Sequence, residues 1–242
     1  MISRWRTAPI RKLGREADVK TYMITAAAAA FFSVFGFILF RGIHSAADRP
    51  EFGNAAIFPE KGGELRWLVL GMAVCNEAIA LFLPWFYGIT AMDTMKAVAF
   101  CTMLWPCAWV DWKRHLIPNR LLLMGLVARF LLFAVELMIS VQEACYIAIG
   151  SVIAAFGSAI ACLLCRLAVP HSVGYGDVKL LAVMGLYLGM DYAWNGILLS
   201  LILLFFAAVF LLLTKRAERG TEMPFAPFLL TGTILAAFLT GI

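Results

Sequence analysis

Two aspartates stand where apolar stretches of the chain meet basic ones. Asp111 follows the apolar run that ends in Trp109 and Val110, and Asp177 stands immediately before another apolar run. Burying an ionisable group at such a place costs free energy, so each aspartate needs a reason to be there. Such a reason exists if the two carboxyl groups share a water molecule, because the repulsion between them raises the pKa of one carboxyl group. The ionised partner can then take a proton from the water while the neutral partner donates to a carbonyl oxygen. This chemistry is peptide hydrolysis by two aspartates, and it needs no metal ion or cofactor.

The residues around Asp177 suit a site that receives an extended peptide. Gly174 and Gly176 permit close approach of another backbone, so a substrate strand can lie against this loop. Lys179 follows two residues after the aspartate and can tune the site or pair with a lipid phosphate. We therefore take Gly174, Gly176 and Lys179 as supporting residues.

The chain after Asp111 reads as a rigid turn. Pro118 has no N–H to donate and can begin a helix, while the residue before a proline is pushed into an extended conformation. Ile117-Pro118-Asn119 would thus fix Asp111 at the end of its helix, and Pro118 and Asn119 join the supporting residues.

A non-catalytic interpretation of the two aspartates competes with the catalytic one. A lone aspartate at a helix end is commonly a solvated loop residue, and Gly-x-Gly-Asp alone is an ordinary turn sequence. Two aspartates in separate structured contexts favour catalysis. Proton or cation transport through the same two carboxyl groups is the main competing function.

The elements that carry these residues are membrane helices. Of the 242 residues, 63% are hydrophobic and only 14% are charged, and the mean hydropathy is +0.88. Soluble domains contain about 25% charged residues. The composition excludes an ordinary soluble domain, a disordered chain and a nucleic-acid-binding module, despite a net charge of +5. It predicts an all-α polytopic bundle.

Eight apolar segments can be drawn along the chain, of which the third and sixth are short. They cover residues 21–40, 67–89, 96–110, 118–139, 144–165, 179–190, 195–213 and 224–242. The first is not expected to be a cleaved signal peptide, because it is long and twenty residues precede it.

The loop cations predict which ends of the segments face the cytoplasm. After residue 90, one set of alternate loops carries all but one of the cations that lie between segments. That set comprises Lys113, Arg114, Arg120, Arg166, Lys179, Lys215, Arg216 and Arg219, whereas the other set carries only Lys96. The loops that contain Asp111 and Asp177 are therefore expected on the cytoplasmic side.

The N-terminal arm disagrees with this orientation. Eight spans place residues 1–20 outside, yet this arm is basic. Either the arm violates the charge rule, or one of the first three segments does not cross. We expect the arm to be an interfacial anchor on anionic membrane lipid, with a partner-binding role as the alternative.

The motifs around the two aspartates together resemble the type IV prepilin peptidase family of membrane aspartic proteases. The family pattern is an aspartate, a short basic stretch and Ile-Pro-Asn, followed later by Gly-x-Gly-Asp-x-Lys-Leu. Residues 111–119 and 174–180 match it in order. Residues 223–228 are similar to the family's Pro-Phe-Gly-Pro-Phe, with Ala226 in place of glycine. The resemblance covers roughly residues 95–240.

Upstream the resemblance is weaker. Residues 33–41 have the spacing of a family Ser-to-Arg stretch, with Gly36 where asparagine is usual, and Glu77 stands where many members have a glutamate. Many bacterial members carry two Cys-x-x-Cys pairs in the loop that corresponds to residues 41–66, a zinc site. This loop contains no cysteine here, so no metal is expected. The methylation that often accompanies the zinc loop is not carried over.

The resemblance implies removal of the basic leader from type IV pilin-like precursors, with Asp111 and Asp177 as the catalytic pair. It also implies an inner-membrane protein with the active-site loops in the cytoplasm. We divide the chain into a basic arm (1–20), two spans with a reduced loop (21–94) and a six-span peptidase core (95–242). Pilin-like precursors and membrane lipid are the expected partners, nucleic acid is not, and the oligomeric state is left open.

Two alternatives remain open at this point. One is an intramembrane aspartic protease for other substrates such as signal peptides, although that group has a tyrosine where Val110 stands. The other is a proton or cation transporter, which is expected to contain an internal repeat and polar residues at mid-depth.

Overall fold

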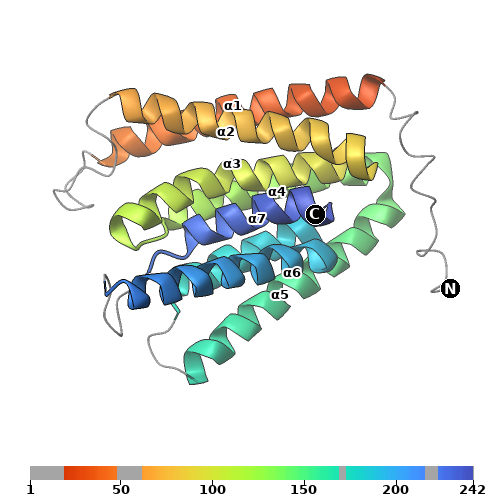
Figure 1. The fold of residues 1–242 in the computed structure, drawn as a ribbon. Helices are drawn as coiled ribbons and strands as arrows, with labels where there is room; N and C mark the ends of the chain where they lie inside the picture. Colours follow the sequence, from red (N-terminus) through yellow and green to blue (C-terminus); the bar gives the residue numbers. More distant parts are fainter. Residues whose placement is uncertain (1–18, 48–61, 169–172, 216–222, 242) are drawn as a thin grey trace.

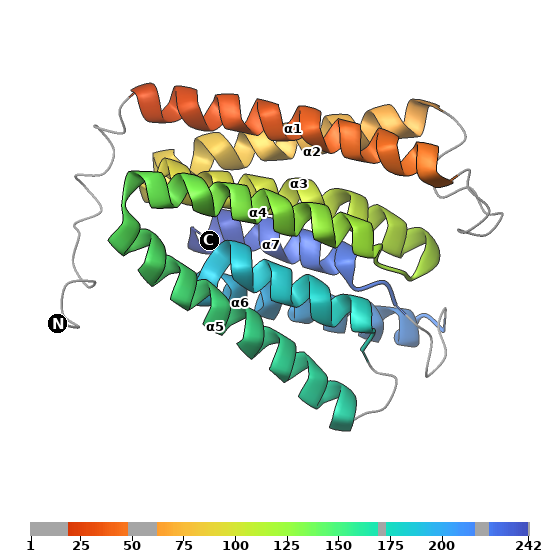
Figure 2. The same ribbon diagram turned by 180° about the vertical axis from the view of Figure 1, so that it is seen from behind.

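The computed structural model describes residues 19–47, 62–168, 173–215 and 223–241, which form helices joined by short connections. The helices are α1 (Val19–Ala47), α2 (Gly62–Phe82), the π-helical turn η3 (Leu83–Tyr87), α3 (Ala91–Arg114), α4 (Asn119–Ile139), α5 (Val141–Ala168), α6 (Tyr175–Leu213) and α7 (Ala226–Thr240). They lie along one common direction, with α5 inclined to the rest (Figures 1 and 2). No strand occurs in the described ranges, so the predicted all-α class is confirmed.

Helix α3 occupies the centre of the bundle. It contacts α1, α2, α4, α6 and α7, and Phe100 and Leu104 are completely buried. Because protein rather than lipid surrounds it, α3 tolerates threonine, cysteine and proline where an exposed span needs continuous apolar residues. This explains why the predicted segment 96–110 is short while the helix itself is long.

Helix α6 is a hairpin of two arms that meet at Gly189. This glycine has φ +72° and ψ −173°, a combination that side-chain-bearing residues rarely adopt. A Cβ on Gly196 would come within 2.4 Å of Met184, yet twelve residues of straight helix span about 18 Å. The chain therefore reverses, and the predicted segments 179–190 and 195–213 are the two arms. The turn lies at a single glycine rather than in a short loop after residue 190.

The first arm of α6 packs closely on α5. A Cβ on Gly185 would approach the backbone nitrogen of Ala155 to 2.5 Å, so the two backbones touch only because residue 185 is glycine. The Gly-x-x-x-Gly pair of Gly185 and Gly189 thus packs a neighbouring helix and turns the chain.

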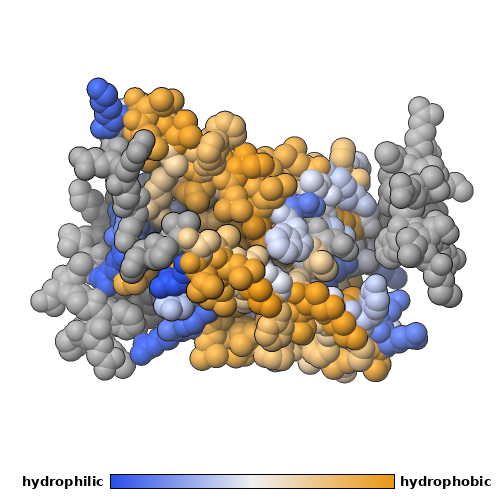
Figure 3. Space-filling view, turned by 90° about the horizontal axis from the view of Figure 1, so that it is seen from below, coloured by the Kyte–Doolittle hydropathy of each residue, from blue (hydrophilic) through white to orange (hydrophobic). Residues whose placement is uncertain are grey.

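The outer helices have the length and composition of membrane spans. Five are long and apolar enough to cross a membrane: Val19–Ile38, Arg66–Tyr87, Asn119–Ile139, Val141–Ala168 and Tyr192–Leu213. One face of the molecule carries a broad hydrophobic band with hydrophilic residues toward its ends (Figure 3). With α3, the first arm of α6 and the shorter apolar α7, the described residues form eight helical segments, as predicted.

The two ends of the bundle carry different connections. Helix α3 ends and both α6 and α7 begin at one end, which we call the aspartate end because it contains Asp111 and Asp177. At the opposite end, α4 passes into α5 and Gly189 reverses the chain. Helices α1, α2 and α3 each run the length of the bundle (Figure 1). Residues 1–18 of the basic arm lie outside the described residues, so its side of the membrane stays a prediction.

Candidate active site

Asp111 lies in the last turn of α3 and is almost completely buried, with 5% of its surface exposed. The helix ends because His115 adopts a left-handed conformation (φ +53°) and donates its backbone N–H to the carbonyl of Asp111 at 2.8 Å. Pro118 then stands in an extended conformation immediately before α4. A turn is therefore present after Asp111, as expected, while its rigidity stays a prediction.

Asp177 lies in the first turn of α6 and is half-buried. Its Oδ2 accepts a hydrogen bond from the backbone N–H of Gly174 at 3.1 Å. An acid here is stabilised by the unpaired N–H groups and by the dipole of the helix. Gly174 thus has a defined role, since its N–H orients the carboxyl group.

The two aspartate loops pack directly against each other. A Cβ on Gly176 would meet the Cβ of Ile117 at 3.1 Å, so residue 176 has to be small for the loops to meet. Lys179 Nζ donates to Asn119 Oδ1 at 3.0 Å and joins the start of α6 to the start of α4. The five predicted supporting residues are therefore brought together with the two aspartates, although their roles in any reaction stay predictions.

The third sequence motif also reaches this site. The backbone N–H of Ala226, the first residue of α7, donates to Asp111 Oδ2 at 2.8 Å, so Asp111 caps a helix that begins 115 residues further along the chain. The motif was recognised in the sequence, but this hydrogen bond was not predicted. The prolines at the start of α7 were the available signal for such a bond. They mark a helix start, and the first N–H groups of a helix have no partner within the helix.

Burial raises the pKa of both carboxyl groups, which lie beyond the ends of the apolar segments. Burial is the main cause that raises the pKa of Asp177 to about 6; the N–H of Gly174 opposes this shift, and the charge of Asp111 adds to it. Burial also raises the pKa of Asp111, while the N–H of Ala226, the charge of His115 and the N–H of Phe225 lower it. The two groups are therefore electrostatically coupled, and their environments differ.

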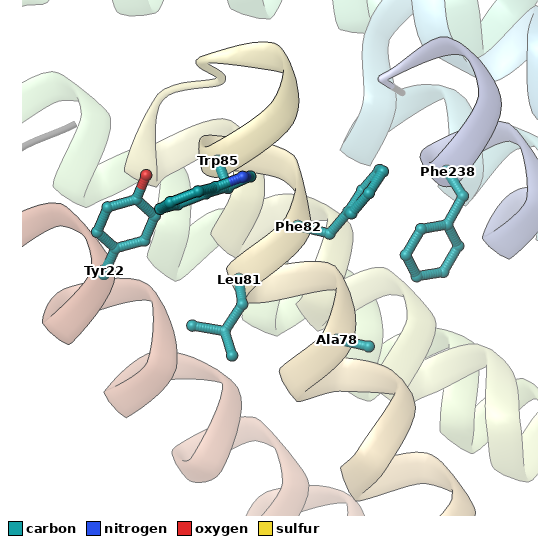
Figure 4. A pocket seen from close by; sticks show the side chains of 6 residues that line it. All are labelled: Tyr22, Ala78, Leu81, Phe82, Trp85 and Phe238. Carbon is teal, nitrogen blue, oxygen red and sulfur yellow. The ribbon is translucent and has the colours of Figure 1, made fainter. Parts of the chain in front are cut away.

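A large apolar hollow lies at the opposite end of the bundle, between α1, α2 and α7. Its volume is about 490 Å³, and its lining consists of Tyr22, Ala78, Leu81, Phe82, Trp85 and Phe238. Tyr22 lies beside Trp85 and Phe82 beside Phe238 (Figure 4). None of these side chains is a carboxylate, imidazole or thiol, so the hollow contains no group able to activate water.

The described residues offer no cluster of three His, Cys, Asp or Glu side chains that is able to ligate a metal ion. The polar groups that converge at the aspartate end are two carboxyls, backbone N–H groups and the Lys179–Asn119 pair. Fold and site together define a polytopic α-helical membrane protein with a coupled pair of aspartates at one end.

Comparison with known proteins identifies the family. Residues 98–214 match the model of the type IV leader peptidase family, so this part of the chain is similar to that family. The match includes both aspartates and the whole of α4, α5 and α6.

Individual relatives agree with the family match. The chain is 33% identical over 152 residues to a prepilin leader peptidase/N-methyltransferase of Bacillus subtilis, an alignment that covers 62% of this chain and 57% of the relative. It is 30% identical over 156 residues to the protein of the same name in Pseudomonas aeruginosa, covering 61% and 50%. The chain thus spans about half the length of the curated relatives it matches. No solved structure matches it significantly.

Proposed function

We propose that this protein is a membrane aspartic endopeptidase that removes the basic leader from type IV pilin-like precursors. The observation that carries the proposal is the coupled pair of Asp111 and Asp177, which lies within the part of the chain that matches the leader peptidase family. Relatives of that part are named prepilin leader peptidases.

The unequal environments of the two carboxyls suggest a division of labour. Asp111 receives the N–H of Ala226 and lies near His115, both of which favour its ionised form. Asp177 has a pKa raised to about 6 and therefore retains a proton more readily. In the proposed reaction, ionised Asp111 takes a proton from a water molecule as the water attacks the peptide carbonyl carbon.

Protonated Asp177 donates a hydrogen bond to the carbonyl oxygen, which bears the developing negative charge. A proton then passes to the leaving nitrogen, and the C–N bond breaks. The pair ends the cycle with one shared proton, as it began. Because the two groups titrate as a unit, the pH dependence of cleavage reports the pair rather than either residue alone.

The membrane orientation is part of the proposal. The loops at the aspartate end carry most of the cations between spans, which favours the cytoplasmic side of the inner membrane. A precursor whose leader is basic and whose next segment is an apolar helix would present its cleavage point at that interface. The proposal covers proteolysis and not methylation, because the relatives extend well beyond the matched region and the loop at 41–66 lacks cysteine.

The test uses the purified full chain in detergent with a pilin-like precursor, and mass spectrometry follows loss of the leader. Asp111→Asn and Asp177→Asn should each abolish cleavage while expression and helical content remain. Glu143→Gln is the matched control, because it neutralises an exposed acid at the start of α5, and it should cleave like the parent. Full activity in either aspartate variant would overturn the mechanism.

A further inference from the structure

Arg129 of α4 lies deep in the bundle, and its guanidinium bonds groups toward the end opposite the aspartates. Only 6% of its surface is exposed. Its Nε donates to the backbone carbonyl of Leu186 at 2.7 Å, and its Nη1 donates to Glu136 at 3.1 Å. A buried arginine that bonds a main-chain carbonyl of another helix needs an explanation beyond a simple ion pair.

The position of Leu186 supplies that explanation. Its carbonyl belongs to the last turn of the first arm of α6, which Gly189 terminates. The last carbonyl groups of a helix have no donors within the helix, and burying them without partners is costly. The guanidinium of Arg129 therefore caps the arm whose first turn carries Asp177.

Further bonds connect the same arm to the same helix. Tyr187 donates its hydroxyl to the carbonyl of Gly125 at 2.6 Å, and Lys179 donates to Asn119. Helix α4 thus bonds the first arm of α6 near both of its ends. Gly125 also fits α4 against α3, because a Cβ there would overlap Met103. One helix therefore sets the first arm of α6 relative to α3, the helix that carries Asp111.

Other buried charged side chains surround the guanidinium of Arg129 at this depth. Glu136 contacts both Arg129 and Lys96 at 3.1 Å, and Lys96 contacts Asp93 at 2.6 Å. Two cations and two anions cancel, which offsets the desolvation that an isolated buried charge would incur. Arginine also suits this position because its planar guanidinium can donate to two acceptors at once, here the carbonyl of Leu186 and the carboxylate of Glu136.

We propose that Arg129 is a positioning residue for the peptidase: by capping the first arm of α6 and joining it to α4, it keeps Asp177 in register with Asp111. The inference rests on the proposed function. Arg129 does not touch the reacting atoms, since it lies near the other end of the arm.

Arg129→Met removes the cap and one ion pair. Its matched control is Lys96→Met, which removes buried ion pairs of the same network but leaves the bond between Arg129 and Leu186. Arg129→Lys keeps a positive charge beside Glu136 but loses the guanidinium that donates to two acceptors. This variant replaces Arg129→Met in the test if the methionine variant fails to fold. For each variant, kcat and KM are measured with the precursor across pH, and amide hydrogen exchange is measured over residues 178–188.

Arg129→Met should lower kcat about 10- to 100-fold through misplacement of Asp177, with KM changed by less than about threefold because the substrate-facing surface is untouched. Amides of residues 178–188 should exchange at least about tenfold faster. Separation of the two carboxyls should also move the alkaline limb of the pH profile to lower pH. Arg129→Lys should move each of these readouts in the same direction. Lys96→Met should lower thermal stability and leave kcat, the pH profile and exchange in this arm unchanged.

If Arg129→Met and Lys96→Met proved alike in kcat and in exchange over residues 178–188, the positioning role would be wrong. If the parent protein cleaved no precursor, the proposed function would fail instead. The exchange measurement would then still decide whether Arg129 orders the arm.

Discussion

The two ends of the bundle both bury charged side chains but stabilise them in different ways. At the opposite end, the carboxylate of Glu136 lies between two cations, Lys96 and Arg129. At the aspartate end, Asp111 and Asp177 accept hydrogen bonds from backbone N–H groups of Ala226 and Gly174. The first arrangement cancels charge within side chains, whereas the second relies on main-chain dipoles.

The difference has chemical consequences. An acid between two cations serves as a structural link, as Glu136 does between Lys96 and Arg129. Burial raises the pKa values of Asp111 and Asp177 although backbone N–H groups lower them, so these carboxyl groups can exchange a proton with water in an accessible pH range. The proposed catalytic role therefore falls on the carboxyl groups that the fold leaves without cations beside them.

Neutralising one acid at each end tests most directly whether the two ends differ in this way. Glu136→Gln should lower the free energy of unfolding by about 3 kcal/mol, because it leaves buried cations uncompensated. Asp177→Asn should change it by less than about 1 kcal/mol but reduce cleavage at least about 10³-fold. Denaturant unfolding in detergent and leader removal measure the two effects. Equal losses in the free energy of unfolding would show that the acids at both ends contribute to stability in the same way.

The raised pKa of Asp177 predicts a pH dependence that belongs to the aspartate end alone. Between its ordinary value of 3.8 and about 6, the folded protein retains a proton at Asp177 that the unfolded chain has released. The contribution of Asp177 to the free energy of unfolding therefore falls as pH rises through this window and is level above it. Cleavage should also decline as pH rises through about 6, since the protonated partner is lost.

Parallel titrations of the parent, Asp177→Asn and Glu136→Gln check this prediction. Asp177→Asn should reduce the stability change between pH 4 and 6, leaving the part that the raised pKa of Asp111 contributes, while Glu136→Gln should preserve the change. A parent whose stability rises over this window would contradict the raised pKa.

Much of this arrangement could be predicted from the sequence, for identifiable physical reasons. Apolar length and loop charge predict the helices, because a bilayer imposes both. Asp111 and Asp177 stand out because ionisable residues are rare in so apolar a chain. The pairing of Arg129 with Glu136 follows from their seven-residue spacing, which places them on one helical face.

The remaining features depend on tertiary packing. No local pattern predicts that Lys96 joins Glu136 or that the N–H of Ala226 reaches Asp111, because each contact joins segments far apart in the chain. The reversal at Gly189 was expected a few residues later, since the sequence does not show which glycine adopts a positive φ.

Alanine at Gly189 tests whether the turn at the opposite end supports the aspartate end. Its φ of +72° and ψ of −173° strain any residue with a Cβ, so Gly189→Ala should destabilise the protein by about 1–3 kcal/mol. Gly150→Ala is the control, because a Cβ there meets nothing within 4 Å. Helix propensity then predicts a gain of up to about 1 kcal/mol. Calorimetry of both variants measures the contrast, and a neutral Gly189→Ala would mean that the turn adapts.

The smallest effect is expected from the hydrogen bond that joins the two aspartate loops at the surface. Lys179 is exposed, and its bond to Asn119 lies in contact with solvent. A double-mutant cycle with Lys179→Met and Asn119→Ala should give a coupling of less than about 1 kcal/mol in unfolding, because solvent screens exposed polar pairs. A coupling near 3 kcal/mol would mean that this end also relies on a strong link between side chains, as the opposite end does through Glu136, Lys96 and Arg129. A weak coupling implies that the aspartate loops meet mainly because Gly176 packs on Ile117 and because α4 secures the arm at Arg129.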